Sequence, residues 1–167
     1  MPISAHKAIR PVGNLLLLGE KDFDNSYFLP FNVNFYQSGT AALAAAIIAC
    51  CKQKPEISEP EVILPAYSCP DLISACLYAG AVPVLVDLEI NSCRMSVNEI
   101  TNCISRNTVA VIAVSFLGIQ ENIKDLDEIC RAREIILIED SAQGFPTSPP
   151  KDYWKSDLVI ISFGRGK

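Results

Sequence analysis

Acidic and amide side chains follow an apolar run near the C-terminal end of the chain. The run Ile135–Ile138 ends in Glu139 and Asp140, and Gln143 comes three residues later. In an open parallel sheet the ligand crevice lies outside the carboxyl ends of the strands, so these three side chains are expected at such a crevice. The alternative is that the acids only mark the point where the chain reaches water.

A second candidate site is the small-residue turn Ser38-Gly-Thr-Ala41, which opens an Ala-rich run that continues to Cys51. Ser38 and Thr40 can cap a helix, and Ala is the strongest helix former. The first backbone N–H groups of a helix, together with its dipole, form an anion site. The alternative is a plain helix N-cap with no ligand.

Buried strands alternate with helical segments along the chain, and this pattern predicts the elements that position these residues. Alternation at about 20 to 25 residues per unit favours right-handed βαβ crossovers. We therefore predict an α/β fold of three layers, a mostly parallel sheet with helices on both faces. The strands are expected near 62–64, 83–87, 108–114, 135–139 and 158–162. The helices are expected from Ser38 to Cys51, up to about Tyr78, from Ser96 to Ile104 and from Ile123 to Ala132.

Composition excludes several classes of protein. The net charge of -5 and the absence of Lys/Arg clusters argue against a nucleic-acid partner. The seven cysteines form no C-x-x-C pair, so they indicate buried thiols in a reducing cytoplasm and no metal site, and His6 is the only histidine. The longest apolar run is too short to cross a membrane, which needs about 20 residues. No G-x-G-x-x-G follows a strand, which argues against a dinucleotide-binding module.

Taken together, these features resemble the DegT-type family of sugar aminotransferases, which use pyridoxal phosphate (PLP) on the fold-type-I aminotransferase scaffold. The resemblance runs from about residue 35 to the last residue. It rests on Ser38-Gly-Thr-Ala41, the loop Pro65-Ala-Tyr-Ser68, the strand Ala79-Gly-Ala-Val-Pro-Val-Leu-Val-Asp87, the Leu117-Gly118 break, Glu139-Asp-Ser-Ala-Gln143 and Ser162-Phe-x-x-x-Lys167.

The resemblance implies a role for each matching residue. Lys167 would be the catalytic lysine, which holds the cofactor as a Schiff base and later moves a proton. Asp140 would face the pyridine nitrogen of PLP, and Gln143 would lie near its phenolic oxygen. The phosphate would be bound by the backbone N–H groups of Thr40 and Ala41 and by the hydroxyl of Ser162.

Two positions depart from the family pattern. Cys69 stands where an aromatic residue usually stacks on the cofactor ring. A sulfur can still pack against that ring, but it covers less area, so weaker retention of PLP is expected. Ser115 stands where a His is common.

The resemblance further implies an enzyme that moves an amino group from a small-molecule donor to a nucleotide-linked keto sugar. It also implies a homodimer and a chain more than twice as long. On that interpretation residues 1–34 are an irregular N-terminal arm, residues 35–167 are part of the PLP-binding large domain, and the C-terminal small domain is absent. Such a part of the enzyme is expected to be inactive by itself. The alternative is a non-catalytic fragment or remnant of the fold with no turnover. A sugar dehydratase of the same family, in which His replaces the lysine, is disfavoured by Lys167.

Overall fold

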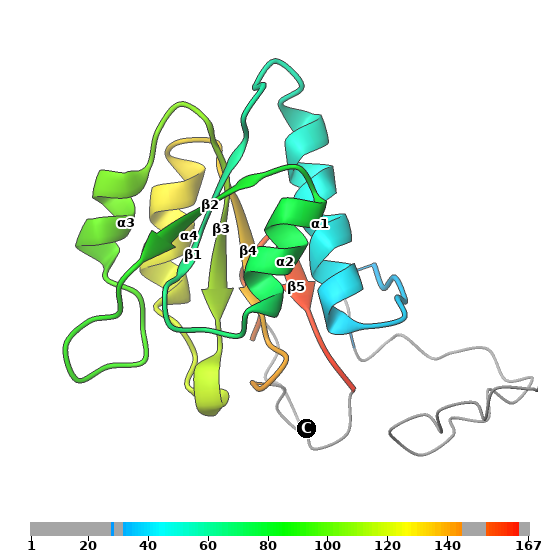
Figure 1. Ribbon diagram of the computed structural model, residues 1–167. Coiled ribbons are helices and arrows are strands. Elements are labelled where there is room, and N and C mark those ends of the chain that lie inside the picture. Colours follow the sequence, from blue (N-terminus) through cyan, green and yellow to red (C-terminus); the bar gives the residue numbers. More distant parts are fainter. Residues whose placement is uncertain (1–27, 29–31, 145–152, 164–167) are drawn as a thin grey trace, which may run out of the picture.

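The computed structural model describes residues 28, 32–144 and 153–163, and these form an α/β unit around one parallel sheet (Figure 1). Its five strands lie in the order β2-β1-β3-β4-β5, and each pairs with its neighbours in parallel. Non-consecutive neighbours require crossovers, which the helices supply. The strands are β1 (Glu61–Pro65), β2 (Val82–Val86), β3 (Thr108–Val114), β4 (Ile136–Asp140) and β5 (Leu158–Ile160).

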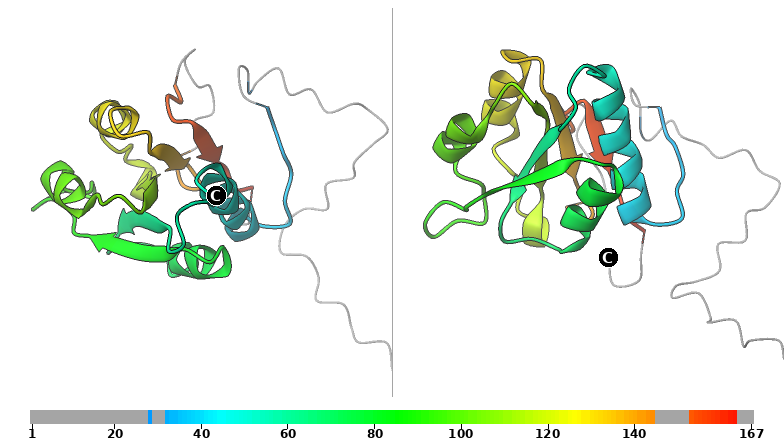
Figure 2. Two further views of the ribbon diagram at one scale, coloured as in Figure 1. Left: turned by 90° about the horizontal axis from the view of Figure 1, so that it is seen from above. Right: turned by 45° about the horizontal axis from the view of Figure 1, so that its top comes forward.

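Helices cover both faces of the sheet (Figure 2). On one face lie α1 (Gly39–Gln53) and α2 (Asp71–Tyr78), and on the other lie α3 (Val97–Cys103) and α4 (Ile123–Arg131). The three-layer α/β architecture expected from the sequence is therefore confirmed. In this architecture the starts of α1 and α2 lie at the same edge of the sheet as the carboxyl ends of the strands, which is where a ligand crevice is expected.

The central strand β3 explains why the sequence pattern was so clear. Its residues Thr108 to Ala113 are at most 1 % exposed, because helices cover the strand from both sides. Val109 and Ile112 pack into the apolar cluster beneath α1 and α2, while Val111 and Ala113 pack into the cluster beneath α3 and α4. A strand buried on both faces is a continuous apolar run, which sequence inspection detects easily.

The bounds of four strands differ from expectation by one or two residues, whereas those of β3 match it. β4 begins at Ile136 and runs through Asp140, and β5 ends at Ile160 instead of continuing to residue 162. Helix α3 begins as predicted after Ser96, whose hydroxyl accepts a hydrogen bond from the Glu99 N–H. Most of the expected arm (1–34) and Lys167 lie outside the described residues.

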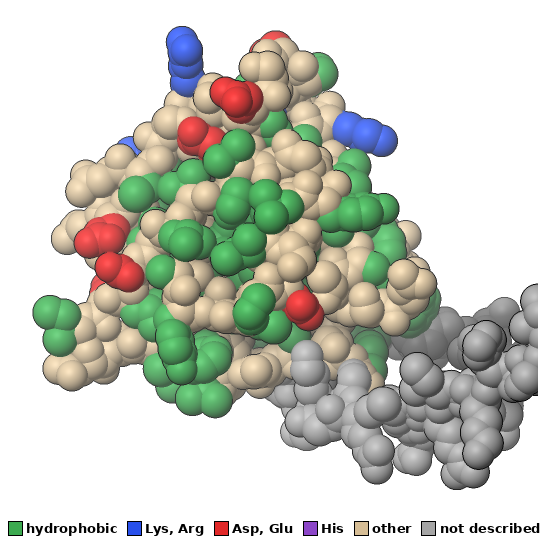
Figure 3. Space-filling model, viewed as in Figure 1, with side chains coloured by type: hydrophobic (Ala, Val, Ile, Leu, Met, Phe, Trp, Pro, Cys, Tyr) green, Lys and Arg blue, Asp and Glu red, His purple; other side chains and the backbone are tan. Residues whose placement is uncertain are grey.

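Apolar side chains gather on the face that carries α2 and β2 (Figure 3). The exposed members on these elements are Leu77, Tyr78, Val82 and Leu85. Within the described part of the chain, none of the helices has the length and apolar character needed to cross a membrane.

Candidate active site

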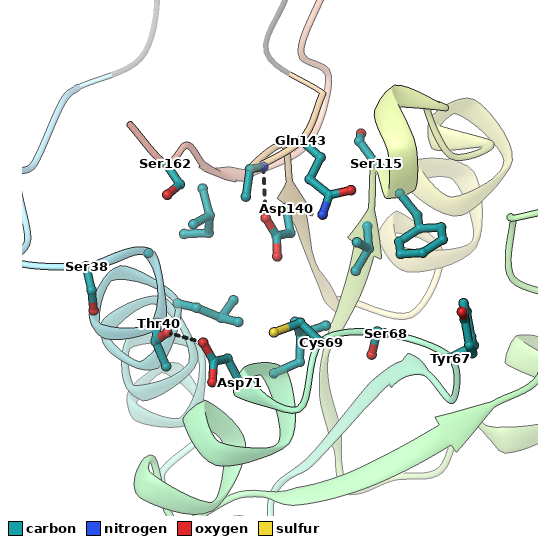
Figure 4. A pocket seen from close by; sticks show the side chains of 17 residues that line it. Ser38, Thr40, Tyr67, Ser68, Cys69, Asp71, Ser115, Asp140, Gln143 and Ser162 are labelled. Atoms are coloured by element: carbon teal, nitrogen blue, oxygen red, sulfur yellow. Dashed lines mark hydrogen bonds between the residues drawn. The ribbon is translucent and has the colours of Figure 1, made fainter. Parts of the chain in front are cut away.

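A pocket of about 670 Å³ opens at the carboxyl ends of β3, β4 and β5, beside the starts of α1 and α2. Figure 4 shows Thr40, Asp71 and Cys69 along one side and Asp140, Gln143 and Ser162 along the other. Six residues implied by the sequence resemblance are found in the described chain, and five of them line this pocket: Thr40, Cys69, Asp140, Gln143 and Ser162. The sheet thus brings together residues more than a hundred positions apart in the sequence.

The start of α1 forms the floor of the pocket. Ser38 is its N-cap, and its hydroxyl oxygen accepts a hydrogen bond of 3.1 Å from the N–H of Ala41. The N–H of Ala41, which the resemblance assigned to the phosphate, therefore already donates to a side chain of the protein. Ala41 is the one of the six residues that does not line the pocket. The N–H groups of Gly39 and Thr40 precede it in the first turn, where a helix leaves its N–H groups without intrahelical partners.

Gly39 brings this helix start against Ser162. A Cβ added at Gly39 would lie 3.5 Å from the Cβ and 3.6 Å from the Oγ of Ser162. The absence of a side chain at position 39 thus lets the helix start and the Ser162 hydroxyl lie close together in the pocket wall. This is the part of the pocket with the donors that an anion needs.

Asp140 ends β4 with its side chain toward the pocket. Its Oδ1 accepts a hydrogen bond of 3.0 Å from the N–H of Ala142, which fixes the carboxylate at the turn after the strand. It is 9 % exposed. A placement of Asp140 and Thr40 on opposite faces of the sheet would have contradicted the predicted cofactor site, but both line the same pocket.

Glu139, which was expected beside Asp140 at the crevice, points to the opposite face. The reason is the period of two in a strand, which sends successive side chains to opposite sides of a sheet. Glu139 is fully buried and accepts hydrogen bonds from the hydroxyls of Ser141 and Ser156. Burial raises the pKa of Glu139 above the usual value, and the hydrogen bonds from Ser141, Gln120 and Ser156 lower it in part. Its role is to join β4 to the segment that leads into β5.

Gln143 is oriented by the backbone of a short 3-10 turn at Phe116–Gly118. Its Oε1 accepts a hydrogen bond of 2.9 Å from the N–H of Leu117, a residue in the left-handed region at φ 54°. Because an N–H can pair only with the amide oxygen, the amide nitrogen must occupy the other position. Figure 4 shows that nitrogen turned toward the interior of the pocket, where it is a hydrogen-bond donor to any ligand oxygen.

Cys69 lies on the loop between β1 and α2, and its sulfur faces the pocket (Figure 4). The neighbouring Tyr67 is exposed and makes an edge-on contact with Phe116, with ring centroids 5.5 Å apart. Aromatic surface is therefore present in the wall next to Cys69. A sulfur and two rings form an apolar side against which a flat ligand can pack.

Asp71 is the pocket residue that sequence inspection missed. Its Oδ2 accepts a hydrogen bond of 3.0 Å from the hydroxyl of Thr40. In the sequence Asp71 is simply an acid in the first turn of α2, a common position because the helix dipole favours it there. The available signal was topological, since the first turns of α1 and α2 meet at the same edge of the sheet.

Ser115 occupies a closely packed position beside the pocket. Its hydroxyl is buried and, within the described part of the chain, has no hydrogen-bond partner. A Cβ added at Gly144 would lie 2.5 Å from the Cβ of Ser115, so these two backbones approach each other closely. The small residue at 115 thus fits a close approach between the end of β3 and the loop after β4.

Of the cysteines, which were expected from the sequence to be buried thiols, Cys50, Cys76 and Cys130 are buried and Cys69 is exposed. Burial raises the pKa of Cys50 and Cys130 to about 12 and that of Cys76 to about 11. These three side chains therefore remain protonated and pack as small hydrophobic residues. Within the described ranges no group of three or more His, Cys, Asp or Glu side chains could hold a metal ion.

Comparisons with known proteins agree with this geometry. GDP-perosamine synthase from Escherichia coli O157:H7 is 31 % identical over 147 residues, which are 84 % of this chain and 39 % of that protein. GDP-4-keto-6-deoxy-D-mannose 3-dehydratase from Escherichia coli O55:H7 is 26 % identical over 147 residues, 83 % of this chain and 38 % of that protein. The chain thus spans about two fifths of the length of these relatives.

Among solved structures, the PLP form of the putative sugar aminotransferase Spr1654 from Streptococcus pneumoniae aligns with a TM-score of 0.56 and 26 % identity. The alignment covers 63 % of this chain and 30 % of that one. PLP is the cofactor that the sequence resemblance implied. The model of the DegT/DnrJ/EryC1/StrS aminotransferase family matches residues 31–151, a range that includes the strands β1 to β4 and most of the pocket. The chain therefore belongs to the DegT/DnrJ/EryC1/StrS aminotransferase family.

Proposed function

We propose that this chain supplies the PLP-binding part of an aminotransferase that acts on a nucleotide-linked keto sugar. The observation that carries the proposal is the pocket itself. It places a helix N-terminus and the Ser162 hydroxyl at one end, and Asp140 and Gln143 near the other. This arrangement matches a ligand with a phosphate at one end and a protonated ring nitrogen at the other.

The residues present fit PLP in size and in chemistry. A pocket of about 670 Å³ lies within the usual range for small-molecule sites, about 300 to 1,000 Å³. Gly39, Thr40 and Ser162 all line the pocket, so the helix start and the Ser162 hydroxyl can face the same phosphate. The N–H of Thr40 and the hydroxyl of Ser162 would bind the phosphate, and the apolar side at Cys69 would face the ring.

When bound, PLP supplies an electron sink that stabilises a carbanion on the substrate. The chain's own groups would set the charge around it. Asp140 would keep a proton on the facing ring nitrogen, because a nearby anion favours the positively charged form of that nitrogen. The amide nitrogen of Gln143, held in place by the Leu117 N–H, would donate a hydrogen bond to the phenolic oxygen.

Lys167 completes the proposal as the residue that would bond the cofactor and move protons, although it lies outside the described residues. A lysine acts as a nucleophile only when part of it is neutral, which a dry site crowded with charge promotes. We further propose a small-molecule amino donor and a homodimeric assembly for the complete enzyme. A nucleotide-linked sugar is favoured as the acceptor, because two relatives are named for GDP-linked sugars.

The proposal is tested by incubating the full chain with PLP, reducing with borohydride and locating the modified lysine by mass spectrometry. Selective modification of Lys167 supports the proposed role. Equal modification of Lys167 and of the exposed Lys124 would mean ordinary surface chemistry and would contradict it. Lys167→Arg is the matched control, because it keeps the charge and removes the amine that can be modified.

The dehydratase among the relatives makes a second reaction testable on the complete enzyme. Incubation of that enzyme with a GDP-linked 4-keto sugar and glutamate distinguishes the two reactions by the mass of the product. Transfer of an amino group adds nitrogen to the sugar, whereas dehydration removes water from it. We expect the aminated sugar because Lys167 is present. Formation of the dehydrated sugar alone would overturn the assignment as an aminotransferase.

A further inference from the structure

The hydroxyl of Thr40 lies at the proposed phosphate end of the pocket but is already engaged. It donates to Asp71 Oδ2 at 3.0 Å, as Figure 4 shows. A hydroxyl has one hydrogen, so this group cannot donate to a phosphate while it donates to Asp71. Binding of a phosphate here therefore depends on the backbone N–H groups at the start of α1 and on the Ser162 hydroxyl, and not on the Thr40 hydroxyl.

The charges around the pocket also disfavour a phosphate near Asp71. Its described lining residues include two carboxylates, Asp71 and Asp140, and no Lys or Arg. Asp140 lies at the end proposed for the ring nitrogen, where a negative charge is useful. Asp71 lies at the other end, within hydrogen-bond distance of a residue proposed to bind phosphate. The Asp71 carboxylate and a phosphate bound at the start of α1 would both be negative and would repel each other.

Asp71 also interacts with the positive end of a helix. It is the acid in the first turn of α2, and its partner Thr40 belongs to the first turn of α1. A carboxylate in this position offsets the partial positive charge that would otherwise attract a phosphate. It therefore stabilises the ligand-free protein at the place where the ligand charge would arrive.

We propose that Asp71 is an affinity-determining residue that weakens the hold of this pocket on the phosphate of its cofactor. The inference depends on the proposed function in that it places the phosphate at the start of α1. Its consequence is a site that exchanges phosphate-bearing ligands more readily than one without this acid. Sequence inspection gave no sign of this, because a first-turn acid is ordinary on any helix.

The test compares wild type with Asp71→Asn, which removes the charge, keeps the size and still offers an oxygen to Thr40. Equilibrium dialysis of the full chain measures the Kd for PLP, for pyridoxal without its phosphate and for inorganic phosphate. We expect Asp71→Asn to bind PLP and inorganic phosphate on the order of tenfold more tightly. The Kd for pyridoxal is expected to stay unchanged, and the gain for PLP should shrink as salt is added, because salt screens exposed charges.

Asp125→Asn is the matched control. Asp125 is likewise an exposed acid in the first turn of a helix, here α4, but it is not among the residues that line the pocket. Its substitution changes the net charge by the same amount and should leave all three Kd values unchanged. Tighter binding in both variants would mean a general charge effect and would overturn the inference.

The outcomes separate the inference from the proposed function. PLP binding that is detectable but equal in wild type and Asp71→Asn would overturn the inference alone. Weaker binding in Asp71→Asn would show that the acid supports the site by holding Thr40, which also overturns it. Absence of PLP binding in both proteins would overturn the proposed function and the inference together. Unchanged thermal melting of Asp71→Asn, measured alongside, excludes a folding defect as the cause of any difference.

Discussion

Gly39→Ala should separate the stability of this protein from its ability to bind phosphate. Gly39 is the first residue of α1 and does not require a left-handed backbone, so Ala fits the helix. Ala is the better helix former, and the gain at a helix start is up to about 0.5 kcal/mol. The added Cβ would lie 3.5 Å from Ser162, an ordinary contact that costs the empty protein little.

The added methyl group would stand between the helix start and Ser162, the two groups that we propose bind the phosphate. A ligand displaced from the helix start or from Ser162 loses at least one hydrogen bond to a charged group, about 1.5 to 3 kcal/mol. That loss corresponds to PLP binding weaker by roughly ten- to hundredfold. One substitution is thus expected to keep or raise stability and to lower affinity.

Gly80→Ala is the opposite case and serves as the control. Gly80 follows α2 at φ +75°, and no heavy atom lies within 4 Å of an added Cβ. The left-handed backbone costs Ala about 1 to 2 kcal/mol, which is partly offset by the lower entropy of the unfolded chain. We expect a net loss of about 1 kcal/mol, a fall in Tm of roughly 2 to 4 °C, and an unchanged Kd for PLP.

Stability is measured by urea unfolding followed through the fluorescence of Trp154, the single tryptophan of the chain, which is buried. Affinity is measured by equilibrium dialysis with PLP. If folded Gly39→Ala binds PLP as tightly as wild type, the phosphate does not lie between the helix start and Ser162, and the reasoning is refuted. Equal loss of binding in Gly80→Ala would refute it as well.

Three further substitutions test the structure around the pocket. Glu139→Gln addresses a buried carboxyl whose folded pKa is raised from 4.5, so its contribution to stability is present below that value and is lost as pH rises through the folded pKa. Urea unfolding at several pH values should show wild type losing stability relative to Glu139→Gln as pH rises, and a relative gain would contradict the raised pKa. Ser38→Ala removes the N-cap of α1 and should cost about 1 kcal/mol of unfolding free energy, whereas an unchanged urea midpoint would show that the cap is dispensable. Gly144→Ala places a Cβ 2.5 Å from that of Ser115 and should lower the Tm, with partial recovery in the double variant that also carries Ser115→Gly; a double variant no better than the single one would locate the strain elsewhere.

The sequence predicted the sheet well wherever burial alone decides the pattern. β3 was predicted with its observed bounds because both of its faces are covered and each position must be apolar or small. β5 was predicted two residues too long, because apolar residues continue after the pairing with β4 has ended at Ile160. Apolar character reports burial, whereas the end of a strand is set by the neighbour with which it pairs.

The elements that were expected to meet do line one pocket, but the way in which their side chains are held did not follow from the sequence. Two acids end β4, and the apolar pattern alone could not say which one faces the pocket, because Ile138 and Leu137 before them are equally apolar. Only the family resemblance assigned Asp140. The packing of Ile138 beneath α1 and α2 shows which face of the sheet each side chain of β4 takes. Asp140 is on the same face as Ile138 and lines the pocket, whereas Glu139 is buried on the other face.

The orientation of Gln143 has a cause that lies outside local sequence patterns. The Leu117-Gly118 break indicated a turn, but a left-handed leucine is uncommon and no propensity predicts it. That unusual backbone aims the Leu117 N–H at the Gln143 oxygen across 26 positions of sequence, which leaves the amide nitrogen for a ligand. A strained residue that orients a polar group is the kind of local conflict expected at a functional site, because the fold elsewhere must stabilise it. The hydrogen bond between Thr40 and Asp71 is equally long-range, so the two interactions that orient polar groups in this pocket both depend on the fold and not on any single motif.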